Sequence, residues 1–219
     1  MMVNKLWALV VMMILLCSVN WGIYRPEQAL LDDVKSAIVA YKANPGSAET
    51  RFELAMALAA SGQIESAWSV LKTIIEYDDD YAKKVIFKYE ALSKKEPKNW
   101  KYPFKLGFGY YFDNRKIQAY EEFNKVLEIN PKMVWAYGFQ GLLLGDQKRF
   151  REALDRCKQA LKIEPDAMAI HFLMAEGYYR VGDYWNAFLR VMRVGQLKTL
   201  EKKKDVYKGS ELDRELIKS

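Results

Sequence analysis

The residues best suited to chemistry are few and widely separated in this chain of 219 residues. The sequence contains one histidine, His171, and two cysteines, Cys17 and Cys157. These residues show no Cys/His spacing of a metal site, and neither a glycine-rich phosphate loop nor a nucleophile elbow is present. The carboxylates are scattered, so no closely paired acid and base is expected. We therefore predict no catalytic residue, no metal, no cofactor and no enzymatic activity.

The elements that would have to position such residues are predicted to be helices. Hydrophobic residues make up 51% of the chain, with only twelve glycines and six prolines, a composition typical of a helix-rich globular protein. The length suits one domain with a short appendage. The two cysteines are far apart and form no disulfide framework, so we interpret both as buried or lipid-facing packing residues.

An apolar segment lies at residues 6–23, preceded by Lys5 and followed by Arg25. These eighteen uncharged residues are just long enough to cross a bilayer. A cleaved signal peptide is the alternative, but the small-residue cleavage pattern is poor, and Trp21 and Tyr24 suit a membrane interface. Residues 1–25 are thus assigned as a transmembrane anchor or signal peptide, with retention favoured. We expect a single-pass protein whose remaining chain lies on the extracytoplasmic (periplasmic) side.

A repeat of 34 residues organises the second half of the chain. Three units run over 100–133, 134–167 and 168–201, and the first two end in LEINP and LKIEP. A small residue occupies the eighth and the twentieth place of every unit, where two paired helices would touch, namely Gly107, Gly141, Ala175, Ala119, Ala153 and Ala187. A fixed period of this length is the signature of a helical solenoid.

The rest of the chain is divided around these units. A divergent fourth unit is predicted at 48–81, because FELAMALAASGQIESAW places small residues at matching positions. Residues 82–99 fit one odd amphipathic helix that ends before Pro97. Residues 26–47 read as an N-terminal packing helix, and 202–219 as a C-terminal capping helix or tail. The solenoid is thus expected to span 48–201 with one interruption.

The units resemble the tetratricopeptide-repeat (TPR) family. The resemblance implies an all-α solenoid of helical hairpins, about four repeats plus extra helices, in which the first helix of each pair lines a concave protein-binding surface. His171 stands where the family has a large packing residue, so we expect it to pack. The family's groove positions fall here on Phe52, Met56, Phe104, Phe108, Tyr111, Trp135, Leu142, Phe172 and Tyr179.

This predicted groove is aromatic rather than charged. Phe104, Gly138 and Phe172 stand where the family's carboxylate clamp needs polar side chains, which disfavours docking of chaperone C-termini. Large rigid rings suit an apolar helix or an extended hydrophobic segment of a protein partner. The alternative is that the chain covers some of these rings itself, because an exposed patch of this size is unusual in a monomer.

A basic block accounts for the formal net charge of +6: residues 82–132 contain twelve Lys or Arg against six Asp or Glu. The candidate patch comprises Lys83, Lys84, Lys88, Lys94 and Lys95. A solvated helix face is the simplest interpretation, and contact with an acidic partner or anionic headgroups is the alternative. No nucleic-acid motif accompanies the charge, so no nucleic-acid partner is expected.

Two classes of function follow from these features. The first is a membrane-anchored scaffold or assembly factor that binds a protein partner, itself membrane-associated, in the aromatic groove. The second is a permanent structural or accessory subunit of a larger membrane protein complex. The sequence does not separate the two.

Overall fold

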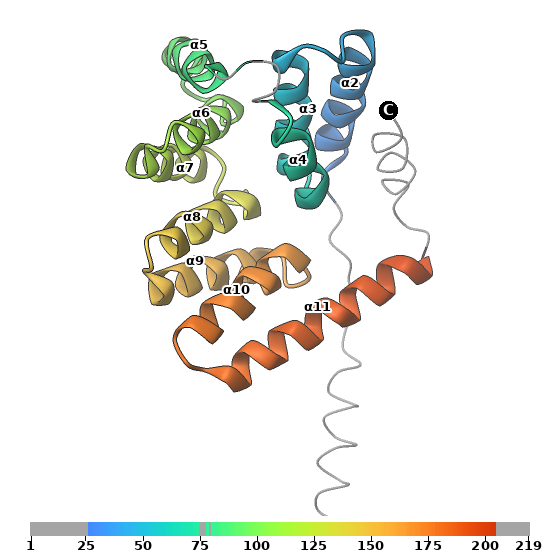
Figure 1. Cartoon of the computed structure of the whole chain (residues 1–219), viewed down its shortest axis with the longest axis vertical. Coiled ribbons are helices and arrows are strands. Elements are labelled where there is room, and N and C mark those ends of the chain that lie inside the picture. The colour runs from blue at the N-terminus through green and yellow to red at the C-terminus, as the bar shows by residue number, and fades with distance from the viewer. Residues whose placement is uncertain (1–25, 75–77, 79, 205–219) are drawn as a thin grey trace, which may run out of the picture.

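Helices account for all the regular structure in the computed structural model, which describes residues 26–74, 78 and 80–204; no strand occurs in these ranges. The helices are α2 (Gln28–Ala43), α3 (Ala48–Ala60), α4 (Ile64–Leu71), α5 (Tyr81–Lys95), α6 (Lys101–Phe112), α7 (Lys116–Ile129), α8 (Val134–Asp146), α9 (Phe150–Ile163), α10 (Met168–Arg180) and α11 (Tyr184–Lys204). They follow an arc from α2–α4 at one end to α10 and α11 at the other (Figure 1).

Four helical hairpins form this solenoid, with α3 packed on α4, α6 on α7, α8 on α9 and α10 on α11. Helices α7, α9 and α11 begin at residues 116, 150 and 184, which is the seventeenth place of each predicted unit of 34 residues. The single helix α2 packs on α3. The predicted odd helix is also present as α5, which packs against α6 and ends before Pro97.

Each hairpin turn contains one residue with a positive φ angle, at the fifteenth place of its unit. The residues and angles are Gly62 at 86°, Asn114 at 58°, Lys148 at 61° and Gly182 at 83°. This left-handed conformation reverses the chain after the first helix of the pair. Because Gly62 is also the fifteenth residue of 48–81, the divergent unit has the same phase as the others.

Small residues allow close packing within the hairpins. An added Cβ atom at Gly107 would lie 2.9 Å from the ring of Phe123, and one at Gly141 would lie 2.9 Å from Cys157 Sγ. Both distances are shorter than a van der Waals contact. The predicted role of these two glycines at the helix–helix contact is therefore confirmed.

The end of the solenoid differs from the sequence-based boundary. Helices α7 and α9 end just before Pro131 and Pro165, but Thr199 takes the corresponding place in α11. Without a proline to stop it, α11 continues to Lys204 and is 21 residues long, against 14 for α7 and α9. Residues 202–204 thus belong to α11, and the remainder of the predicted capping segment lies outside the described residues.

No helix within the described ranges is long and apolar enough to cross a membrane. The predicted anchor at 6–23 lies outside those ranges. It therefore stays a prediction.

Candidate functional site: an apolar cleft beside helix α5

Five of the nine predicted groove residues are buried inside the solenoid: Phe52, Met56, Phe104, Phe108 and Trp135. Phe104 and Phe108 contact Phe139 of the next repeat, with ring centroids 5.8 and 4.6 Å apart, respectively. The prediction that these five side chains line an open groove is wrong, because neighbouring helices cover them. They form the core that holds successive repeats together.

The other four predicted groove residues remain accessible but do not form one surface. Tyr111 and Leu142 are half-buried on α6 and α8, whereas Phe172 and Tyr179 are exposed on α10. Leu142 borders a second depression, between α8, α9 and α10, that also includes Glu176 and Arg180. The concave surface is thus less aromatic than the sequence predicts.

An apolar cleft of about 310 Å³ lies where the odd helix interrupts the solenoid. Its walls come from α3, α4, α5 and α6 and the segment that follows α4, and its lining is Phe52, Trp68, Leu71, Lys72, Ile74, Asp78, Tyr81, Ala82, Val85, Gly109 and Phe112. The cleft exists because α5 packs mainly on α6 instead of covering α4 as a following repeat would. A cleft of this size and lining is typical of a binding site for an apolar group.

Trp68 and Phe112 form an accessible aromatic pair in the lining of this cleft. Their rings are stacked with centroids 6.4 Å apart, and the two residues are 39% and 40% exposed. Tyr111 lies beside Trp68 at 6.5 Å. Neither Trp68 nor Phe112 was predicted from the sequence, because neither residue stands at one of the family's groove positions. The signal was an aromatic side chain on the amphipathic helix α4, directly before the irregular segment.

Polar groups are few in the cleft. Asp78 pairs with Lys84, with 2.5 Å between the carboxylate and ammonium groups. Burial, followed by the charges of Glu49 and Glu53, raises the pKa of the Tyr81 hydroxyl well above its usual value. The hydroxyl therefore stays neutral at physiological pH, and the wall it forms with Phe52, at a ring separation of 5.7 Å, carries no charge.

The predicted basic patch is engaged mainly within the chain. Lys83 pairs with Asp80 at 2.6 Å, Lys84 with Asp78, and Lys88 with Glu49 at 2.7 Å. All five lysines are exposed, and Lys94 and Lys95 lie in the last turn of α5, where cations are favoured by the helix dipole. The five lysines thus do not present one free cationic surface.

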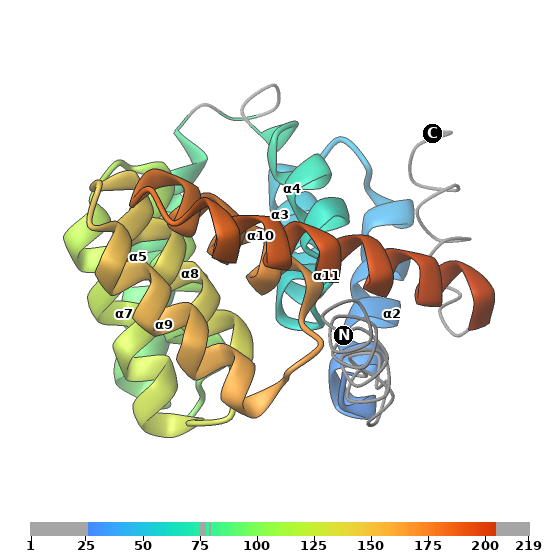
Figure 2. The same ribbon diagram turned by 90° about the horizontal axis from the view of Figure 1, so that it is seen from below.

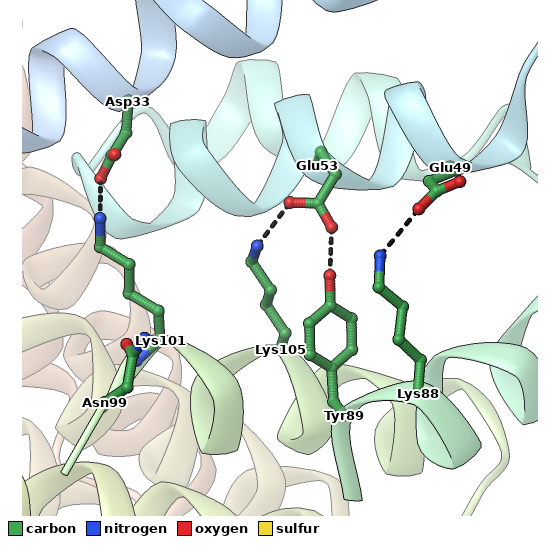
Figure 3. A network of polar contacts seen from close by, with 8 residues as sticks. All are labelled: Asp33, Glu49, Glu53, Lys88, Tyr89, Asn99, Lys101 and Lys105. Carbon is green, nitrogen blue, oxygen red and sulfur yellow. Dashed lines mark hydrogen bonds and ion pairs between the residues drawn. The ribbon is translucent and has the colours of Figure 1, made fainter. Parts of the chain in front are cut away.

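Further lysines of the basic block connect helix α6 to helices α2 and α3 through ion pairs (Figure 3). Lys101 of α6 binds Asp33 of α2 at 2.5 Å, and Lys105 of α6 binds Glu53 of α3. Glu53 also accepts a hydrogen bond from the Tyr89 hydroxyl of α5. These acid–base pairs connect α2 and α3 to α5 and α6; of these helices, α3, α5 and α6 line the cleft.

The histidine and the described cysteine are packing residues of the solenoid. His171 is buried, as predicted; Pro165 O lies 2.8 Å from Nε2, and the Arg190 guanidinium lies 3.3 Å from Nδ1. Cys157 is buried, and burial raises the pKa of its thiol to about 12. Cys17 lies outside the described residues. Within the described ranges, no group of three or more His, Cys, Asp or Glu side chains could hold a metal ion.

The described residues form an all-helical solenoid of helical hairpins. Comparison with known proteins gives no matching family model and no matching curated sequence. Among solved structures, "Crystal structure of MamA" is similar with 16% identity and a TM-score of 0.48, covering 78% of this chain and 89% of that one. "MamA 41-end from Desulfovibrio magneticus RS-1" has 14% identity and a TM-score of 0.46, covering 80% and 88%, respectively.

Proposed function

We propose that this protein is a protein-binding scaffold that holds an apolar segment of a partner protein in the cleft beside α5. The observation that carries the proposal is the apolar cleft itself, with Trp68 and Phe112 accessible in its lining. Buried aromatic anchors supply much of the binding energy of protein interfaces. A cavity of about 310 Å³ is at the lower end of ligand-pocket volumes, which suits one or two large side chains.

The scaffold is further proposed to be tethered to a membrane through residues 6–23, with the solenoid on the extracytoplasmic side and a membrane-associated partner. The support is the uncharged apolar segment directly before the solenoid. Fractionation tests this part by itself. The full chain should resist high-salt and carbonate extraction from membranes, and its intact mass should include Lys5.

The binding proposal is tested by placing a photo-crosslinking phenylalanine derivative at position 68 of the full chain in native membranes. The matched control carries the same group at Phe87, which is 81% exposed on α5 and is not among the cleft-lining residues. We expect one partner to be captured from position 68 and not from position 87. Trp68→Ala should then weaken binding of that purified partner by about 30-fold or more, whereas Phe87→Ala should leave it unchanged.

Equal capture from both positions, or unchanged affinity of the Trp68 variant, would contradict binding in the cleft. A blue-native gel of solubilised membranes separates the two classes of function. A scaffold or assembly factor should appear in several substoichiometric complexes, whereas a permanent subunit should migrate with one complex of fixed stoichiometry.

A further inference from the structure

The last hairpin exposes apolar side chains at places where the inner hairpins are covered. At the fifth place of the unit, Phe172 is 62% exposed, whereas Phe104 is 2% exposed. At the twenty-first place Phe188 is 52% exposed and Leu154 is 5% exposed; at the twenty-fourth place Val191 is 56% exposed and Cys157 is 2% exposed. In the inner repeats the next hairpin supplies part of this cover, as when Leu154 packs on Gly177. The last hairpin therefore keeps a surface of the kind that another helix covers.

We name this surface the terminal face and define it as Phe172, Tyr179, Tyr184, Trp185, Phe188, Leu189, Val191 and Met192. Tyr184, Phe188, Val191 and Met192 recur at the spacing of one helix face. Tyr179 joins α10 to that face, because its ring lies 5.6 Å from the ring of Tyr184. Among the described helices, α11 is the outermost at this end of the solenoid (Figure 2).

The charged residues of α11 between Tyr184 and Gly195 lie away from the terminal face. Arg190 approaches His171 Nδ1, and Arg193 pairs with the buried Asp166. Both arginines are half-buried. Arg190 and Arg193 thus lie outside the terminal face, whereas the exposed ion pair of Glu176 and Arg180 lies in the same stretch of α10 as Phe172 and Tyr179.

Among the described residues, no helix follows α11 in the way that α8 follows α7 and α10 follows α9. Helices α8 and α10 begin three residues after Pro131 and Pro165, respectively. Because α11 continues to Lys204, a following helix cannot start at the equivalent place. The described residues therefore supply no following hairpin that covers the face.

We propose that the terminal face is the interface of a homodimer, in which α10 and α11 of two copies pack against each other about a twofold axis. Five aromatic residues of the face are more than half exposed, and each contributes roughly 100–150 Å² of accessible area. With Leu189, Val191 and Met192, the face amounts to about 800 Å², which is what each partner buries in a stable interface of standard size. A typical monomer exposes a smaller contiguous patch.

Symmetry also suits the distribution of charge along α11. The apolar residues lie between 184 and 195, and the lysines follow at 198 and 202–204. If two α11 helices cross antiparallel near Val191, the apolar stretches overlap and the two lysine-rich ends point in opposite directions. A twofold interface of this kind buries the same patch on both copies, so no cationic end faces its own counterpart.

The first test places a single reactive cysteine at the centre of the terminal face. Val191→Cys is introduced into the full chain with Cys17→Ser, while the buried Cys157 is kept, and native membranes are oxidised mildly. The matched control is Gln159→Cys on the exposed side of α9. We expect a disulfide-linked dimer from Val191→Cys and none from Gln159→Cys.

The second test measures the mass of the detergent-solubilised full chain by light scattering. Phe188→Glu places a charge in the terminal face, so it should raise the dimer dissociation constant by about 30-fold or more. Ile117→Glu, at a residue 70% exposed on α7, should leave the dimer intact. Both variants should keep the helical circular dichroism of the parent.

Three results would overturn the homodimer. The first is a monomeric mass together with no crosslink from Val191→Cys. The second is a disulfide that joins Val191→Cys to a different protein. The third is a Phe188→Glu variant that loses binding to phosphatidylglycerol vesicles while its oligomeric state is unchanged, which would assign the face to the lipid surface.

Discussion

The contact between α8 and α9 permits a sharp test with two glycines of the same helix. Gly141→Ala would place its Cβ atom 2.9 Å from Cys157 Sγ and 3.3 Å from the carbonyl oxygen of Ala153, whereas Gly145 has no such neighbour within 4 Å. Overpacking costs about 1–3 kcal/mol, and replacing a helical glycine by alanine gains about 1 kcal/mol. Gly141→Ala should therefore lower the free energy of unfolding by about 1 kcal/mol, and Gly145→Ala should raise it by up to about 1 kcal/mol.

The two variants should thus differ by about 2 kcal/mol. For a chain of this size, that difference corresponds to about 4–8 °C in Tm, measured by far-ultraviolet circular dichroism of the full chain in one detergent. Adding Cys157→Ala to Gly141→Ala should remove part of the clash, so the two changes should be less than additive in their cost. Equal Tm values for Gly141→Ala and Gly145→Ala would refute the argument that the helices touch at Gly141.

Three further predictions concern polar groups that are buried or half-buried. Burial raises the pKa of the Glu122 carboxyl, and its Oε2 atom has no hydrogen-bond partner. Glu122→Gln should therefore increase the free energy of unfolding at pH 7 by about 1 kcal/mol. Urea unfolding should show that this gain shrinks as the pH falls toward 4, because the carboxyl then becomes protonated in both the folded and the unfolded state. Burial lowers the pKa of His171, so the free energy of unfolding should fall as the pH drops below about 6.5, because the unfolded state takes up the proton first. In the same assay, His171→Gln should remove this dependence of stability on pH. Glu53→Ala leaves the partners of its carboxylate, including Lys105, unsatisfied, and should lower the free energy of unfolding by about 1–3 kcal/mol. Hydrogen exchange should then be faster in α2–α4 than in α8–α10. Equal exchange in both regions would contradict a role of Glu53 in connecting α3 to α5 and α6.

Much of the fold could be predicted because its repeat is local in sequence. The spacing of small residues such as Gly107 and Ala119, and the prolines after α7 and α9, determine the hairpins and their phase. The missing proline at Thr199 was also visible in the sequence, and it explains the length of α11. Helix boundaries of this kind depend on residues within one unit.

The candidate site was harder to predict because exposure depends on contacts between units. Phe104 and Phe108 occupy family groove positions, yet Phe139 of the next repeat packs against both. Conversely, Trp68 is accessible because α5 packs mainly on α6 and leaves α4 partly uncovered. No periodicity within α4 or α6 determines that choice of partner.

The turn residues of the four hairpins show how such a repeat can persist while its sequence diverges. The left-handed place is occupied by Gly62, Asn114, Lys148 and Gly182. A lysine there costs about 1–2 kcal/mol of backbone strain, but the helices packed on either side of the turn still impose that conformation. A residue other than glycine is therefore compatible with the same path of the backbone at this place. The four hairpins of this solenoid therefore share the left-handed turn conformation even though they do not share the residue that adopts it.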